Sequence, residues 1–157
     1  MPVHKEAVVC SGAVLQGDVT VGDGSIIHPL AELRANGGAI VIGANCVVEE
    51  RVQILSSAGS ITSIGDFCHL EVYAVVQPGA QLGRGCLVEC RGMVPEGCNL
   101  QAGCCVGVGA AAPAAGLTSN VLVYGTVGAT RVVENSEAVN VEAVTAQLQA
   151  SWPLLAK

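Results

Sequence analysis

The segment IGDFCHLEVYAVVQPGAQL, residues 64–82, has an aliphatic residue at every sixth position, at Ile64, Leu70, Val76 and Leu82. A period of six matches neither an amphipathic helix, whose period is near 3.6, nor a single half-buried strand, whose period is 2. It is typical of a solenoid in which very short strands are joined by tight corners. The segment therefore predicts an all-β solenoid, the parallel β-helix of hexapeptide repeats.

The same period extends outward from this segment in both directions. Two spacings deviate from six: nine between Leu33 and Ile42, and ten between Ile54 and Ile64. The residues in between are rich in Gly and Ser, so we expect loops that bulge from corners of the solenoid. Further aliphatic residues on the period are Val3, Val9, Leu15, Val21, Ile27, Leu33, Ile42, Val48, Ile54, Val88, Val94, Leu100 and Val106.

Length and composition indicate a single domain without nucleic-acid binding. The 157 residues are 51% hydrophobic and 13% charged, with a formal net charge of −6 and no basic cluster. We expect residues 1–133 to form the solenoid, with a last strand near Val121–Gly125. The N-terminus lacks an apolar signal core, and no run of apolar residues is long enough to span a membrane. A soluble cytoplasmic protein without direct membrane insertion is therefore expected.

Residues 134–157 form a C-terminal segment with a different period. Apolar residues spaced 3, 4, 4 and 3 predict an amphipathic helix with Ser136 or Asn140 as N-cap. Pro153 should end or kink this helix. We expect it to pack on the solenoid, and one face could also dock on a partner, with Trp152 as a candidate contact. The apolar positions are Val141, Val144, Leu148, Trp152 and Leu155.

Half of the eight cysteines occupy one repeat position. Stacked coils place them in a line with a spacing of about 4.8 Å, and a line of thiols cannot surround zinc tetrahedrally. Parallel Cβ vectors also disfavour disulfides, so we expect reduced thiols that fill one inner corner. Cys10, Cys90 and Cys105 fall outside this column and could be more exposed. The column is Ala7, Ser25, Cys46, Cys68, Cys86 and Cys104.

A second column is polar. It follows the second aliphatic position of each coil and comprises Cys10, His28, Glu49, Glu71, Glu89 and Gly107. Adjacent carboxylates repel by about 1 kcal/mol in water, and Arg51 and Arg91 could offset part of this repulsion. Three interpretations stay open: a solvated ladder, a docking strip for a basic partner and a catalytic carboxylate pair. The candidate interface residues are His28, Glu49, Glu71, Glu89, Arg51, Arg91 and Trp152.

Two groups of hexapeptide enzymes were compared with the chain. It resembles the γ-class carbonic anhydrases in Gly17–Asp18 and in the repeats from Ile42 and from Ile64, but Leu55, Val72 and Gln77 stand where that family has three metal-binding histidines. None of these side chains replaces an imidazole ligand, so no metal or other cofactor is expected. An acyltransferase would need one histidine as general base, for which His28 and His69 are candidates.

Neither histidine lies on a long loop that could form a substrate cleft, and a histidine in such a ladder is more often structural. The sequence therefore favours a protein that is not an enzyme and has no catalytic residue.

The chain also resembles the dynactin subunit 6 family, whose members belong to the dynactin pointed-end complex. The matching stretches are Gly17–Gly22, Ile26–Pro29, Ile40–Gly43, Val48–Glu50, Leu70–Val72, Val88–Glu89, Gly103–Cys105 and Val123–Gly125. Subunit 5 is a close alternative, although Ile27–Pro29 and Leu70–Val72 favour subunit 6.

This resemblance implies a left-handed β-helix with a C-terminal helix. It also implies a cytoplasmic, cytoskeleton-associated scaffold that docks laterally on dynactin subunit 5 and other pointed-end subunits. Such a protein would support dynein-dependent cargo targeting, as a heteromer rather than a homotrimer.

Overall fold

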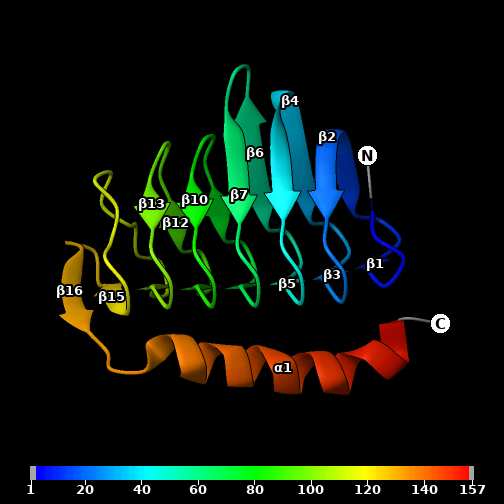
Figure 1. Cartoon of the computed structure of the whole chain (residues 1–157). Helices are drawn as coiled ribbons and strands as arrows, with labels where there is room; N and C mark the ends of the chain where they lie inside the picture. The colour runs from blue at the N-terminus through cyan, green and yellow to red at the C-terminus, as the bar shows by residue number, and fades with distance from the viewer. Residues whose placement is uncertain (1–2, 156–157) are drawn as a thin grey trace.

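The structure, a computed structural model that describes residues 3–155, is a parallel β-solenoid of about six turns with one C-terminal helix. Short strands from successive coils stack in register, and the coils follow one another along the rod (Figure 1). The fold class predicted from the six-residue period is therefore confirmed. The period works because it returns an aliphatic side chain to the interior once on each of three faces per coil.

One face of the rod is an eight-stranded sheet in which consecutive coils pair in parallel. Only its last pair, β15 with β16, is antiparallel. This final strand turns back and covers the edge of the last coil, and its sequence gave no period by which to predict it. The strands in spatial order are β1 (Val8–Val9), β3 (Ile26–Ile27), β5 (Val47–Val48), β8 (His69–Leu70), β11 (Leu87–Val88), β14 (Cys105–Val106), β15 (Val121–Tyr124) and β16 (Ala129–Val132).

The strands of the other two faces are hydrogen-bonded into a second sheet. Its long members run past a corner of the rod, so the first predicted loop, at Asn36–Gly38, lies within strand β4, whereas the second is a turn at Ala58–Gly59 between β6 and β7. Strand β4 pairs with β6 through Asn36↔Ser57 and with β7 through Ala39↔Ile61, which satisfies the backbone groups of the extension. The strands are β2 (Val14–Val21), β4 (Glu32–Ile42), β6 (Gln53–Ser57), β7 (Ile61–Ile64), β9 (Val75–Val76), β10 (Gln81–Leu82), β12 (Met93–Val94) and β13 (Asn99–Leu100).

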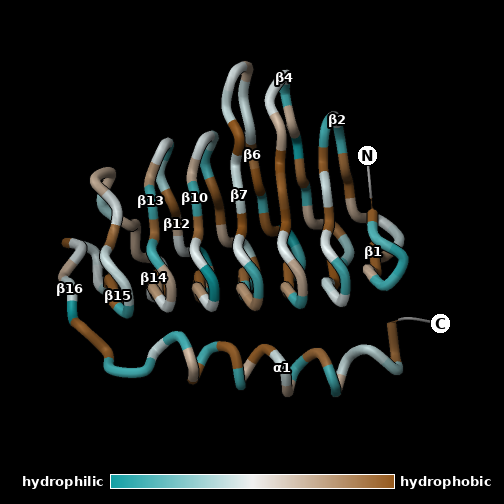
Figure 2. The backbone as a smooth tube through the Cα atoms, viewed as in Figure 1, coloured by the Kyte–Doolittle hydropathy of each residue, from teal (hydrophilic) through white to brown (hydrophobic). Residues whose placement is uncertain are grey.

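The interior contains the aliphatic ladders and one column of thiols. Hydrophobic residues recur along every coil in Figure 2, and the ladder side chains from Val19 to Val123 are almost completely buried. The column thiols do more than fill space, because each donates to a carbonyl oxygen of the following coil. Cys68 Sγ lies 3.1 Å from the Gly83 oxygen, and Ser25 Oγ, in the same column, lies 2.8 Å from the Gly43 oxygen. All eight cysteines are free.

Helix α1 (Ser136–Leu155) runs antiparallel to the direction of the coils, from the last coils back toward the first (Figure 1). Its start is held by Asn120, whose Oδ1 accepts the Glu137 N–H at 3.0 Å. Val144 and Leu148 are buried against outward residues of β3 and β5. The helix continues through Pro153, so this residue does not end it. Within residues 3–155 no helix combines the length and hydropathy of a membrane span.

Candidate functional site

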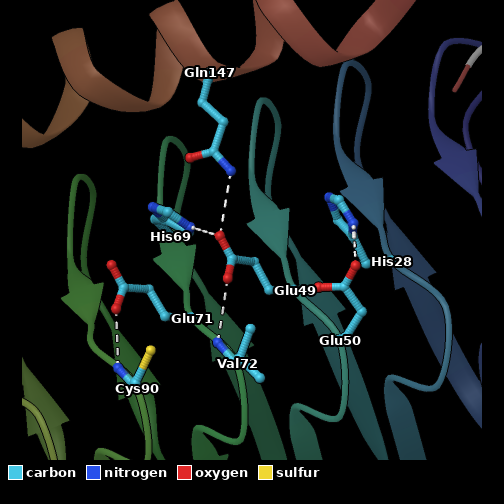
Figure 3. A network of polar contacts seen from close by, with 8 residues as sticks. All are labelled: His28, Glu49, Glu50, His69, Glu71, Val72, Cys90 and Gln147. Atoms are coloured by element: carbon cyan, nitrogen blue, oxygen red, sulfur yellow. Dashed lines mark hydrogen bonds and ion pairs between the residues drawn. The ribbon is translucent and has the colours of Figure 1, made fainter. Parts of the chain in front are cut away.

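The polar column forms a continuous ladder along one corner of the rod. Strand register pairs Ile27 with Val48, Val48 with Leu70 and Leu70 with Val88. The residues that directly follow these positions therefore stack, with a spacing of about 4.8 Å. This ladder comprises His28, Glu49, Glu71 and Glu89. Figure 3 shows its first three members beside helix α1.

Each glutamate of the ladder accepts a backbone N–H from the next coil. Glu71 Oε2 accepts the Cys90 N–H at 2.9 Å, and Glu89 Oε2 accepts the Val108 N–H at 3.1 Å. Glu49 Oε2 has the same relation to Val72, at 3.3 Å. A carboxylate is suited to this position because the corner N–H has no backbone carbonyl as a partner, and a charged acceptor makes a strong hydrogen bond to it. The carboxylates are thereby engaged within the rod.

Glu49 is the most highly connected member of the ladder. His69 Nε2 lies 2.7 Å from Glu49 Oε1, and Gln147 of helix α1 donates to the same oxygen at 3.2 Å (Figure 3). The side chains of His69 and Glu49 are 13% and 19% exposed. The hydrogen bond from His69 lowers the pKa of Glu49 against the opposing effect of burial. This contact joins the helix to the middle of the rod.

His28 forms a separate pair in the neighbouring coils. Its Nδ1 lies 3.3 Å from Glu50 Oε1, and its side chain is 17% exposed. Among the described residues, His28 Nε2 is a buried side-chain nitrogen without a hydrogen-bond partner. The sequence singled out both His28 and His69, but the acidic partner of each could not be chosen without the coil-to-coil register.

Arg51 and Arg91 lie in the same turns as Glu49 and Glu89, because the Val52 N–H bonds to the Glu49 carbonyl oxygen and the Gly92 N–H to that of Glu89. Their guanidinium carbons lie 5.8 Å and 5.4 Å from the ring centroid of Tyr73, which stands between them. All three residues have a left-handed backbone, with φ of 60°, 64° and 59° for Arg51, Tyr73 and Arg91. This conformation closes the turns that begin at Glu49, Glu71 and Glu89, and it brings both guanidinium groups near Tyr73.

The remaining predicted positions fall in two other places. Trp152 packs on the cluster that joins α1 to the first coils, beside Cys10 and Val8. Leu55 and Gln77 follow paired residues of β6 and β9, so they neighbour each other, whereas Val72 lies next to the glutamate ladder. Across residues 3–155, no three His, Cys, Asp or Glu side chains lie close enough together to hold a metal ion.

The fold and the ladders define a hexapeptide-repeat solenoid protein, and no family model matches the chain. Its sequence is similar to dynactin subunit 6 of Nematostella vectensis, with 40% identity over 50 residues, and of Danio rerio, with 43% identity over 51 residues. Each match covers 32% of this chain and 27% or 26% of the relative. The chain thus spans about a quarter of the length of these relatives.

Proteins with other names are also similar over about half of the chain. Carnitine operon protein CaiE of Escherichia coli is 34% identical over 85 residues, which is 54% of this chain and 43% of that protein. Bifunctional protein GlmU of Clostridium kluyveri is 27% identical over 81 residues, which is 52% of this chain and 17% of that protein.

Two solved structures show how widely the fold is shared. A hexapeptide transferase family protein from Anaplasma phagocytophilum has a TM-score of 0.86 and 18% identity, covering 98% of this chain and 92% of its own. LpxA, a UDP-N-acetylglucosamine acyltransferase from Bacteroides fragilis, has a TM-score of 0.58 and 11% identity, covering 90% and 75%. At such identities the likeness concerns the fold alone.

The expectation that the chain is not an enzyme is contradicted by these comparisons. Its fold is that of proteins named as transferases and acyltransferases, and its sequence is similar to GlmU. The expectation relied on Leu55, Val72 and Gln77, which remove only a three-histidine metal site, and on the lack of a long loop beside His28 and His69. An acyltransferase needs a general base and not that site, so the substitutions do not exclude catalysis by this fold.

Proposed function

We propose that this chain is a docking subunit of the dynactin subunit 6 type. The observation that carries the proposal is the 40–43% identity to dynactin subunit 6 from two animals. The matching stretches quoted from the sequence include the ladder residues His28, Glu49, Glu71 and Glu89. Those residues bind the coils to one another and to α1, so they would preserve a rigid rod.

A rigid rod suits a protein that assembles through its sides. Its faces are flat because stacked strands repeat the same side-chain positions about every 4.8 Å. Helix α1 covers one face, and the corners and faces away from α1 are available to other chains. In this proposal the partners are dynactin subunit 5 and other pointed-end subunits, and the setting is dynein-dependent transport in the cytoplasm, on the cytoskeleton.

Affinity purification from cells tests this proposal. The chain, expressed with a small tag, should recover dynactin pointed-end subunits in stoichiometric amounts, and a tagged chain of LpxA would serve as the control for non-specific capture by the same fold. Recovery of the pointed-end subunits at the level of the LpxA control would refute the proposal.

Acyl transfer is a second candidate function, and the His69–Glu49 pair is the observation that favours it. A carboxylate 2.7 Å from an imidazole nitrogen holds the ring in one orientation, as a general base requires. The test is acetyl transfer from acetyl coenzyme A to amine and hydroxyl acceptors. Activity that His69→Asn abolishes, with the fold retained, would support this candidate, and activity that is unchanged in that variant would remove His69 from it.

A further inference from the structure

The two ends of the eight-stranded sheet are built differently. At one end the antiparallel strand β16 covers β15 of the last coil. At the other end β1, a strand of the first coil, stands last in the sheet and pairs with β3. The strands β1 and β16 lie at opposite ends of the rod (Figure 1). The outer edge of β1 is therefore a template to which a further strand can add.

The hydrogen bonds of β1 show which of its backbone groups stay open. The Val8 N–H donates to the Ser25 oxygen of the next coil at 2.9 Å. The Cys10 N–H donates to the Ile27 oxygen at the same distance. Alternate residues of a strand direct these groups to opposite neighbours, so the N–H and C=O of Val9 point away from β3. No strand pairing among residues 3–155 engages them on that side.

The exposure of the first coil gives independent evidence of an open end. Val9 belongs to an inward ladder in which Ile27 and Val48 are completely buried, yet Val9 itself is 37% exposed. Val3 is 39% exposed, whereas Val21, its partner in the second coil, is completely buried. A solenoid buries such residues by stacking one coil on another. Within the described residues, the first coil lacks the cover that the second coil receives.

A cavity of about 340 Å³ lies next to β1, between the first coil and helix α1. Its lining is Lys5, Glu6, Ala7, Val8 and Trp152. Val8 and Trp152 also belong to the apolar cluster that joins α1 to the first coils. A strand added to β1 would place one side chain over Val8 and beside the indole, and the next side chain over Val9. The open edge thus combines free backbone groups with apolar surface on both sides of the sheet.

We propose that the outer edge of β1 binds an extended segment of a partner protein, which adds to the sheet as a parallel strand. This inference rests on the proposed docking function and places a contact at the end of the rod. The occupant is a strand because the open groups are a backbone N–H and C=O, which the backbone of an extended segment pairs. A second copy of this chain could stack head to tail only by displacing β16 from the last coil.

The columns of side chains that reach the first coil specify the sequence of the bound segment. One column contains small residues, and the next two contain aliphatic residues that point outward and inward, respectively. A parallel strand that continues them should have a small residue followed by two aliphatic residues. The columns are Ala7, Ser25 and Cys46; Val8, Ile26 and Val47; and Val9, Ile27 and Val48.

Val9→Pro tests this edge when binding of purified dynactin subunit 5 is measured by calorimetry. Proline removes the outward N–H of Val9, and it is tolerated on the edge of a sheet. The affinity should fall about tenfold or more, because the variant can no longer donate to the added strand. Val9→Ile is the matched control, since it keeps the N–H and an aliphatic side chain, and it should alter the affinity less than about twofold. Equal affinities of the two variants would overturn the proposal.

A peptide titration tests the edge if subunit 5 does not bind, a result that would count against the proposed function alone. The probe is a heptapeptide with Ser-Val-Ile at its centre, flanked by glycines and terminal lysines. The control peptide carries a methyl group on the valine nitrogen, which removes the donor toward the Ala7 oxygen. The probe should shift the amide resonance of Val9 and slow its hydrogen exchange about tenfold at saturation, and the control should do neither.

An unchanged Val9 resonance, or equal effects of the two peptides, would overturn the proposal. A homodimer of the free chain that Val9→Pro dissociates would also overturn it, because the edge would then belong to a contact between two copies of this chain. Light scattering of the wild type and of Val9→Pro distinguishes these outcomes, and the proposal predicts the same mass for both free chains.

Discussion

Replacing Glu49 by Gln should destabilise the protein by about 2 kcal/mol near neutral pH. Glu49 accepts hydrogen bonds from His69 at 2.7 Å, Gln147 at 3.2 Å and the Val72 N–H at 3.3 Å. A hydrogen bond to a charged group contributes about 1.5–3 kcal/mol, against about 0.5–1.5 kcal/mol for a neutral one. A Gln side chain keeps its shape but loses the charge, and its NH₂ group must face one of these donors.

The effect should depend on pH in a defined direction. Because the pKa of Glu49 is lowered in the folded state, its contribution is complete above the ordinary carboxyl pKa and is lost as the pH falls through the lowered value. The difference in free energy of unfolding between wild type and Glu49→Gln should therefore be largest near neutral pH and shrink toward about pH 3.

Urea denaturation followed by circular dichroism at the two pH values measures this difference. Glu96→Gln is the control, since Glu96 is exposed and its loss removes the same charge. Equal stabilities of the two variants near neutral pH would refute the reasoning, as would a deficit of Glu49→Gln that does not change with pH.

Three further predictions concern the helix and the thiols. Gly103→Ala should lower the free energy of unfolding in urea titrations by several kcal/mol more than Gly97→Ala. Both glycines have a left-handed backbone, but a Cβ on Gly103 would meet the Glu137 backbone, whereas one on Gly97 meets nothing within 4 Å. Equal losses would contradict the packing of α1. Asn120→Ala should cost about 1 kcal/mol and increase amide hydrogen exchange at the start of α1, since it removes the acceptor of the Glu137 N–H; unchanged exchange would contradict this cap. Alkylation of the native protein, followed by mass spectrometry, should not modify the five buried thiols until the chain unfolds, because burial blocks the reagent. Burial also raises the pKa of Cys98, which reduces its reactive thiolate form. The protected residues are Cys46, Cys68, Cys86, Cys98 and Cys104.

The ladders could be derived from the sequence because a solenoid converts spacing into position. Once three repeats form a coil, Glu49, Glu71 and Glu89 must stack, and so must Cys68 and Cys86, whatever the details of the corners. The contacts of the corner side chains could not be derived from the sequence. A corner residue can bind a backbone N–H, an acidic side chain or an aromatic ring, and its backbone φ decides which of these lies within reach. The left-handed backbone of Arg51 and Arg91 turned these side chains toward Tyr73.

Two features of the backbone were also beyond the periodicity argument. The Gly- and Ser-rich insertions were both expected to form loops. The second is a turn at Ala58–Gly59, but the first lies within strand β4, where Asn36 pairs with Ser57, because backbone pairing outweighs weak local preference. Strand β16 has no repeat of its own and pairs with β15 only because the last coil offers a free edge.

The mass of the complex formed with dynactin subunit 5 tests the central claim most directly. Light scattering coupled to size-exclusion chromatography should be run on the purified chain, on subunit 5 and on their mixture. The docking account predicts a mixed species whose mass equals the sum of one copy of each chain. A homotrimer of this chain that elutes unchanged in the presence of subunit 5 would contradict the account.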